Sequence, residues 1–287
     1  MADQQSGTPN AREVQYWNSA HTRAWADEYE VIDELFAGLT RVALDLAAPK
    51  PGERVIDIGC GSGTTVLELA ARVGPSGYVL GADVSKPSVE KARERITAAG
   101  IHQAEVVLCD ASTHEFPANG SDLVFSRFGV MFFADPVAAF ANIRKAMKLD
   151  GRLALAVFRT LQENKWATAI LAAVRHLLPP ITPPGPEEPG QFSWGDPARV
   201  RRILEAAGFQ DVSLTSHDPA MPLAGRGGAA EAASFMLRVG PVVRATSDAS
   251  EEQRKEVRAA LEAFFQNHEG PQGIVLQGAI WIVTARA

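Results

Sequence analysis

A glycine-rich turn directly after a short apolar run constrains this sequence most. Residues 55–58 (Val-Ile-Asp-Ile) are mainly β-branched, and glycines follow at positions 59, 61 and 63. The run predicts a buried strand, and the apolar spacing from Thr64 onward predicts a helix. Glycines at alternate positions let the chain turn sharply and let a ligand approach the backbone. The helix start offers that ligand free N–H groups and a partial positive charge.

The spacing of these glycines excludes two common phosphate-binding loops. A dinucleotide fingerprint needs its third glycine three residues after the second, and that position is Thr64. A P-loop needs a following Gly-Lys-Ser/Thr, which is absent here. On the glycines alone, a structural turn without any ligand remains open.

Strand and helix patterns alternate over the hundred residues that follow Pro51. Repeated βαβ units predict an α/β fold, a doubly wound and mostly parallel sheet of the Rossmann-like type. Right-handed crossovers place the carboxyl ends of the parallel strands at one edge, where ligands of open α/β sheets bind. The expected strands are 55–58, 78–82, 106–109, 122–126 and 152–158, and the expected helices begin near 64, 87 and 135.

Two aspartates follow later strands at this edge. Asp83 ends the second strand, and its carboxylate can accept two hydrogen bonds from a ribose diol. Asp110 ends the third strand and suits an exocyclic amine of adenine, and the small Ala111 beside it leaves room for a ring. The alternatives are a solvated or helix-capping side chain at Asp83 and an Asx turn at Asp110.

Composition limits the partners that we expect. The chain has 287 residues and a net charge of -6 without a basic block, which argues against nucleic acid or an anionic membrane as partner. The first dozen residues are polar and are expected to be disordered, without a signal peptide. No apolar run is long enough to span a bilayer, so we expect a cytoplasmic protein. Cys60 and Cys109 are expected to be reduced thiols, and no metal-ligand spacing is present.

The flanks suggest further parts around this core. Trp25, Tyr29, Ile32 and Phe36 recur at helical spacing, which predicts helices before the first strand. A proline-rich stretch and two further helical segments interrupt the later alternation, before a last strand at 274–285. The expected division is a helical cap at 1–48, a cofactor-binding core at 49–158, a lid insertion at 159–195, and the rest of the core at 196–287 with a helical insertion at about 220–270.

Several motifs in order carry a resemblance to a known family. They are Val-Ile-Asp-Ile-Gly-Cys-Gly-Ser-Gly at 55–63, Gly-Ala-Asp-Val-Ser at 81–85, Leu-Cys-Asp-Ala at 108–111, Ser-Asp-Leu-Val-Phe-Ser-Arg-Phe-Gly at 121–129 and Leu-Asp-Gly-Arg-Leu at 149–153. The chain resembles the class I S-adenosylmethionine-dependent methyltransferases. It is most similar to the small-molecule branch that includes the ubiquinone and menaquinone C-methyltransferases.

The resemblance implies a seven-stranded sheet with a helical lid, and a role for each matched residue. The methionine part of S-adenosyl-L-methionine would meet Asp57 and the backbone of Gly59 and Gly61. The ribose would bind Asp83, and adenine would lie between Val84 and the Asp110–Ala111 edge. Arg127 and Phe128 would line the methionine side and the substrate entry. The product would be S-adenosyl-L-homocysteine.

The expected reaction is methyl transfer to a small, mainly apolar or aromatic acceptor by in-line displacement. Alignment of the reactants could supply most of the rate effect, and a base is needed only for a protonated nucleophile. Candidate bases are His21, His176 and His217, and Arg127 and Arg159 could bind an acidic group of the acceptor. Roof residues near the acceptor would be Tyr16, Trp17, Phe132, Trp166 and Trp194.

The alternative is a protein that binds the cofactor without methyl transfer, either a cyclase-like enzyme or a non-catalytic binding module. The methylated atom and the oligomeric state are not defined by the sequence.

Overall fold

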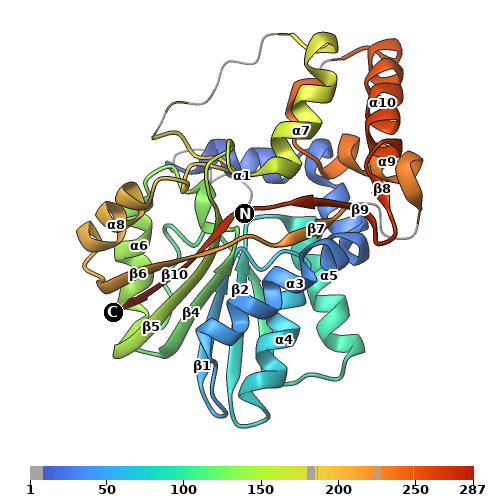
Figure 1. Ribbon diagram of the computed structural model, residues 1–287. Coiled ribbons are helices and arrows are strands. Elements are labelled where there is room, and N and C mark those ends of the chain that lie inside the picture. Colours follow the sequence, from blue (N-terminus) through green and yellow to red (C-terminus); the bar gives the residue numbers. More distant parts are fainter. Residues whose placement is uncertain (1–8, 180–184, 186, 224–226, 248) are drawn as a thin grey trace.

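Seven strands form one main sheet at the centre of the molecule (Figure 1). The computed structural model describes residues 9–179, 185, 187–223, 227–247 and 249–287. The strand order is β3-β2-β1-β4-β5-β10-β6, in which only β10 runs antiparallel to its neighbours. This confirms the doubly wound, mostly parallel fold. The strands are β1 (Arg54–Ile58), β2 (Tyr78–Asp83), β3 (Ala104–Leu108), β4 (Ser121–Arg127), β5 (Met147–Phe158), β6 (Gln210–His217) and β10 (Ile280–Arg286).

Strand β1 lies in the middle of the parallel part and pairs with β2 and β4. Its last four residues are buried, as expected of a parallel strand covered on both faces. The sheet order also has its switch point here, because the chain continues from β1 to β2 on one side and returns to β4 on the other. The end of β1 is therefore the place where a ligand crevice forms in such sheets.

Five helices cover the two faces of the sheet (Figure 1). Two of them begin at an aspartate whose side chain accepts a backbone N–H: Asp135 from Ala138, and Asp196 from Ala198. One face carries α3 (Tyr29–Ala47), α4 (Thr64–Val73) and α5 (Lys86–Ala98), and the other carries α6 (Pro136–Lys145) and α8 (Pro197–Ala206).

The remaining helices gather above the carboxyl ends of the strands and form a roof (Figure 1). The N-terminal part and the C-terminal insertion meet there, since Arg238 donates a 2.8 Å hydrogen bond to Glu28. The roof comprises α1 (Ala11–Trp17), η1 (Ala20–Thr22), α2 (Ala24–Asp27), η2 (Val130–Phe132), α7 (Lys165–Val174), η3 (Arg175–Leu177), α9 (Gly228–Val239), η4 (Arg244–Thr246), α10 (Glu251–Gln266) and a small sheet of β7 (Ala220–Pro222), β9 (Gly273–Gln277) and β8 (Glu269–Gly270).

Two sequence expectations are wrong. The strand expected at 274–285 is divided, because β9 joins the small sheet and β10 joins the main one. Between them the Gly278 N–H donates to the Pro219 carbonyl at 2.9 Å, and the Ala279 N–H donates to Asn164 Oδ1 at 2.8 Å. These bonds bend the chain out of one sheet and into the other. The tail expected to be disordered is helical from Ala11 onward, and residues 1–8 lie outside the described residues.

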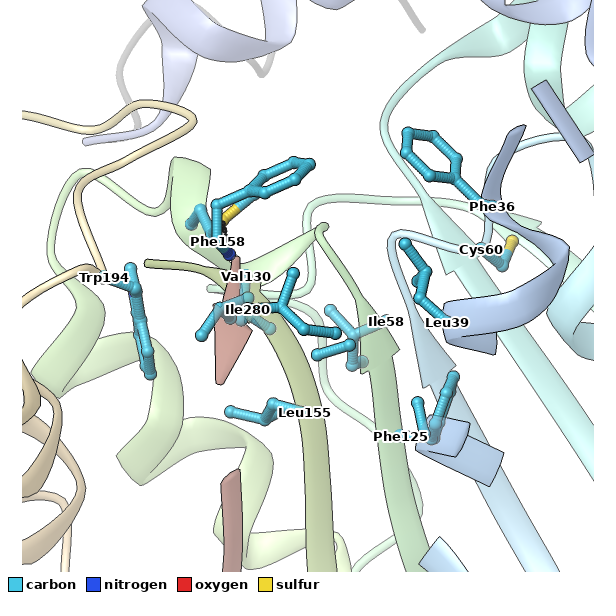
Figure 2. Packing of buried hydrophobic residues seen from close by; sticks show 14 of the residues in the cluster. Phe36, Leu39, Ile58, Cys60, Phe125, Val130, Leu155, Phe158, Trp194 and Ile280 are labelled. Carbon is cyan, nitrogen blue, oxygen red and sulfur yellow. Dashed lines mark hydrogen bonds between the residues drawn. The ribbon is translucent and has the colours of Figure 1, made fainter. Parts of the chain in front are cut away.

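Trp194 is a core residue and does not line the roof as expected. It is 1% exposed, and its ring centroid lies 5.4 Å from that of Phe140 on α6. Figure 2 shows it apart from Phe36 and Phe158 within the same cluster of buried residues. The pattern of aromatics along the sequence could not show that Trp194 packs against α6. Among the described residues, no helix has the length and apolar character needed to cross a bilayer.

We expect Trp194→Ala to lower the free energy of unfolding by about 3–5 kcal/mol, because it empties a large core site. The measurement is the urea midpoint, converted with the slope of the transition. Leu149→Ala is the control, since Leu149 is 90% exposed and should change stability by less than about 0.5 kcal/mol. Equal effects of the two substitutions would contradict the placement of Trp194 in the core.

Candidate functional site

The glycine turn after β1 is held open by its backbone conformation. Gly59, Gly61 and Gly63 have φ values of 68°, 54° and 86°, a region that favours glycine. A Cβ atom at Gly59 would lie 2.5 Å from the Cα atom of Gly129, so no larger residue fits between the two loops. A Cβ at Gly61 would meet nothing within 4 Å. Gly61 therefore presents bare backbone to an open space, which a ligand can approach closely.

The carboxylate of Asp83 fastens this turn to the end of β2. One of its oxygens accepts the Gly61 N–H at 2.8 Å, and the other accepts the Ser85 N–H at 2.8 Å. Burial raises the pKa of Asp83, while these backbone hydrogen bonds act in the opposite direction. Each carboxylate oxygen has a second lone pair, so Asp83 can accept further hydrogen bonds from a ligand.

Asp57 is a fully buried carboxyl group at the end of β1. Thr65 donates a hydrogen bond to its Oδ2 atom, and its Oδ1 atom has no partner. Burial raises the pKa of Asp57 to about 7, against the opposing effects of the Thr65 hydrogen bond and the Arg127 charge. Arg127 itself donates to Thr40 Oγ1 at 2.8 Å. A buried acid with a free oxygen suits a cationic hydrogen-bond donor.

Asp110 both forms the Asx turn and offers a free acceptor. Its Oδ1 atom accepts the N–H and the hydroxyl group of Ser112, at 2.9 and 2.7 Å. Its Oδ2 atom is buried without a hydrogen bond. Ala111 beside it is 5% exposed. An Asx turn and a ligand contact are therefore compatible at Asp110, because the turn uses Oδ1 and leaves Oδ2 free.

Helix α1 crosses this edge and is fixed at both of its ends by asparagines. Before the helix, Asn10 donates to Asp110 Oδ1 at 3.4 Å and accepts the Ala134 N–H at 3.1 Å. After the helix, Asn18 donates to the Val84 carbonyl at 2.8 Å and accepts the Lys86 N–H at 3.0 Å. The helix therefore spans from the end of β3 to the end of β2.

The inner side of the roof is aromatic. Trp17 of α1 lies edge-on to Tyr16, Trp25 and Phe132, with ring centroids 5.7, 5.8 and 5.1 Å apart. Three of the residues expected to cover the site, Tyr16, Trp17 and Phe132, are therefore in one cluster. This cluster joins α1 to η2, the turn that follows β4.

A second aromatic group follows the ends of β4 and β5. Phe128 stacks in parallel on Phe158, with ring centroids 4.2 Å apart, and Phe36 lies 5.2 Å away. Phe128 has a φ of 67°, which is rare for a bulky residue. Trp166 and Phe192 lie 5.7 and 5.8 Å from the Phe158 ring. Strained backbone of this kind occurs preferentially at functional sites.

The other candidates are Arg159 and three histidines. Arg159 makes ion pairs with Asp218, at 2.8 Å, and with Glu163, so its charge is already compensated. His21 and His176 are exposed, and His217 is half-buried in the last position of β6. Among the described residues, no three His, Cys, Asp or Glu side chains come together as metal ligands would.

The unpartnered acceptors test which ligand these residues fit. Buried side-chain oxygens without a hydrogen bond include Asp57 Oδ1, Asp110 Oδ2, Glu13 Oε2 and Ser19 Oγ, all at or under the roof. Such groups cost free energy unless a ligand donates to them. An ammonium group and an adenine amine are donors of the required kind. The free acceptor oxygens of Asp57 and Asp110 therefore fit S-adenosyl-L-methionine.

Three site residues are missed by the sequence analysis. Asn10 lies in a polar stretch that is expected to be disordered, and Glu13 and Asn18 belong to no recognisable sequence motif. Their partners are more than sixty residues away in the chain, as in the Asn18–Val84 hydrogen bond. Only the spacing of Glu13, Val14 and Trp17, which places them on one side of a helix, indicates that this helix faces inward.

Comparisons with known proteins agree with this geometry. Over 128 residues the chain is 38% identical to aklanonic acid methyltransferase DauC of Streptomyces sp. (strain C5), a match that covers 44% of this chain and 58% of that protein. Over 193 residues it is 31% identical to nocamycin O-methyltransferase of Saccharothrix syringae, covering 64% of this chain and 69% of the relative. The matched part of the chain therefore spans less than two thirds of the length of the first relative.

The fold also has solved counterparts. The YcgJ protein from Bacillus subtilis superimposes with a TM-score of 0.56 at 16% sequence identity, over 86% of this chain and 97% of that one. Residues 49–208 match the family profile described as a methyltransferase domain. Since this match covers more than half of the chain and contains the glycine turn, Asp83 and Asp110, the chain belongs to the methyltransferase-domain family, whose cofactor is S-adenosyl-L-methionine.

Proposed function

We propose that this chain transfers a methyl group from S-adenosyl-L-methionine to a small, mainly apolar or aromatic acceptor. The observation that carries the proposal is the stack of Phe128 on Phe158 beside the end of β4, with Phe36 on its other side. These rings form a largely buried apolar cluster near the residues that we assign to the cofactor. The names of the two relatives, which describe methyltransferases of aklanonic acid and nocamycin, support an acceptor of this class.

The bound cofactor supplies a methyl group that is already activated on a sulfonium. The work of the chain is then to bind, orient and exclude water. We assign Asp57 and the Gly59–Gly61 backbone to the methionine part, Asp83 to the ribose, and Val84 with the Asp110–Ala111 edge to adenine. Helix α1 would close the adenine and ribose side of the site, because its two ends are bonded at the ends of β3 and β2.

The acceptor would enter beside Arg127 and Phe128. The Arg127 guanidinium is turned toward Thr40 and the Phe36 ring, 2.8 and 5.4 Å away, so it supports the wall of the site in this structure. Trp166 packs behind Phe158 and its indole N–H donates to Asn164, which makes it a support of the same wall. The exposed positions of His21 and His176 favour a nucleophile that needs no histidine base.

We also propose a division of labour along the chain. Residues 49–158 form the cofactor-binding core, which residues 196–287 complete, while the cap at 1–48, the lid insertion at 159–195 and the helical insertion at about 220–270 select the acceptor. The ion pair between Arg238 and Glu28, which joins the last of these parts to the cap, supports this division.

The decisive test is activity with isotopically labelled S-adenosyl-L-methionine and a panel of phenols, amines and carboxylic acids. We expect transfer of label to an apolar or aromatic member, with formation of S-adenosyl-L-homocysteine. Transfer only to a protein or an RNA would contradict the small-molecule acceptor. Cofactor binding without any transfer would favour the alternative, a cyclase-like enzyme or a binding module.

Asp83→Ala is expected to weaken binding of S-adenosyl-L-homocysteine by about one to two decades, as one or two hydrogen bonds of the ribose are lost. The same substitution frees the Gly61 N–H, so the loop loses its attachment to β2. Calorimetric titration measures the dissociation constant. Asp150→Asn serves as the control, because Asp150 is exposed and lies at the opposite end of β5 from the site. An unchanged affinity in Asp83→Ala would remove this residue from the site.

Binding of S-adenosyl-L-homocysteine should also depend on pH through Asp57. Burial raises the pKa of this carboxyl group to about 7, so the group is mostly protonated below pH 7 and ionised above it. The ionised form attracts the cationic amino group of the ligand. We therefore expect affinity to increase as pH rises from 6 to 7.5. Asp57→Asn should bind more weakly and lose this dependence, and a parallel pH profile in both proteins would refute the role of Asp57.

A further inference from the structure

Glu13 is a buried carboxylate in the roof that the cofactor assignments leave without a role. The residue is 8% exposed, and its Oε2 atom makes no hydrogen bond. Burial raises the pKa of Glu13, and the charges of Arg244 and Arg12 oppose that change. The nearest Arg244 nitrogen is 3.8 Å from Oε2, beyond hydrogen-bond distance. An acidic oxygen in this position is costly unless a ligand donates to it.

The neighbours of Glu13 place it between two parts of the roof. The Arg244 guanidinium of η4 lies 4.2 Å from the centroid of the Tyr16 ring, one turn after Glu13 on α1. Tyr16 in turn contacts Trp17, and Trp17 contacts Phe132 behind the end of β4. Glu13 thus belongs to a continuous group of side chains that runs from the C-terminal insertion to the strand ends.

The cofactor already has its polar partners elsewhere. Asp57, Asp83 and Asp110 all lie within residues 49–208, the segment that matches the methyltransferase domain. Glu13 and Arg244 both lie outside that segment. Features shared by the family bind the shared ligand, so a carboxylate outside them is suited to the ligand that differs between members, which is the acceptor.

We propose that Glu13 is a specificity residue of the acceptor site, whose Oε2 atom accepts a hydrogen bond from a hydroxyl group of the methyl acceptor. Arg244 holds the carboxylate in place through its charge and its contact with Tyr16. The acceptor class is then a hydroxylated aromatic or apolar molecule. This inference rests on the proposed function.

The test uses Glu13→Gln in the full chain, with Glu256→Gln on the exposed side of α10 as the matched control. Two measurements need no acceptor. The melting temperature of the ligand-free variant should stay close to that of the wild type, because Oε2 makes no hydrogen bond and its ion pair with the exposed Arg244 is long, at 3.8 Å. The dissociation constant for S-adenosyl-L-homocysteine should change by less than about threefold. A lower melting temperature would make Glu13 a structural residue, and a large loss of affinity would assign it to the cofactor; either result overturns the proposal.

The third measurement uses hydroxylated naphthoic acids and anthraquinones beside the same compounds without the hydroxyl group. We expect the wild type to prefer the hydroxylated member of a pair in kcat/KM by about tenfold to hundredfold, as one hydrogen bond to a charged group provides. Glu13→Gln should lose most of that preference and Glu256→Gln should keep it. Turnover by the wild type without any preference would overturn the role of Glu13 alone. The absence of turnover across the panel would count against the proposed function and this inference together.

Discussion

The contact between Gly59 and Gly129 sets the shape of the site. The two glycines follow neighbouring strands, and their backbones approach so closely that a Cβ atom on either would overlap the other. Ser126 reinforces the contact, since its hydroxyl group donates to the Ile58 carbonyl at 2.7 Å and accepts the Gly129 N–H at 3.2 Å. The turn after β4 therefore packs against the turn after β1 and supports it. The residues that we propose for the cofactor and those that we propose for the acceptor are positioned relative to each other through this one approach.

The sequence was sufficient to predict the central fold because the relevant interactions are local or repetitive. Continuous apolar runs identified the buried strands. The candidate cofactor residues could be placed at one edge because each follows or ends a strand in a sheet of known handedness. What could not be predicted depends on contacts between distant segments. The division of the last strand depends on Asn164, and the burial of Trp194 depends on Phe140.

The site is also unusually rich in acidic groups for its degree of burial. Asp57, Asp83 and Glu13 all have a raised pKa because burial disfavours their charged forms. A cationic ligand reverses that effect, because its positive charge stabilises the ionised carboxylates. The positive charge of S-adenosyl-L-methionine therefore offsets the cost of burying these carboxylates. S-adenosyl-L-homocysteine has lost the sulfonium charge and retains only part of the attraction.

The two asparagines at the ends of α1 have a consequence for ligand exchange. Asn10 and Asn18 bond to Asp110 and to the Val84 carbonyl, while Arg238 attaches the segment after α1 to the C-terminal insertion. Raising the helix would break both asparagine contacts, at the end of β3 and at the end of β2, in the same movement. A ligand that enters beneath α1 would therefore exchange at the cost of both contacts together, while Glu28 and Arg238 hold the following segment in place.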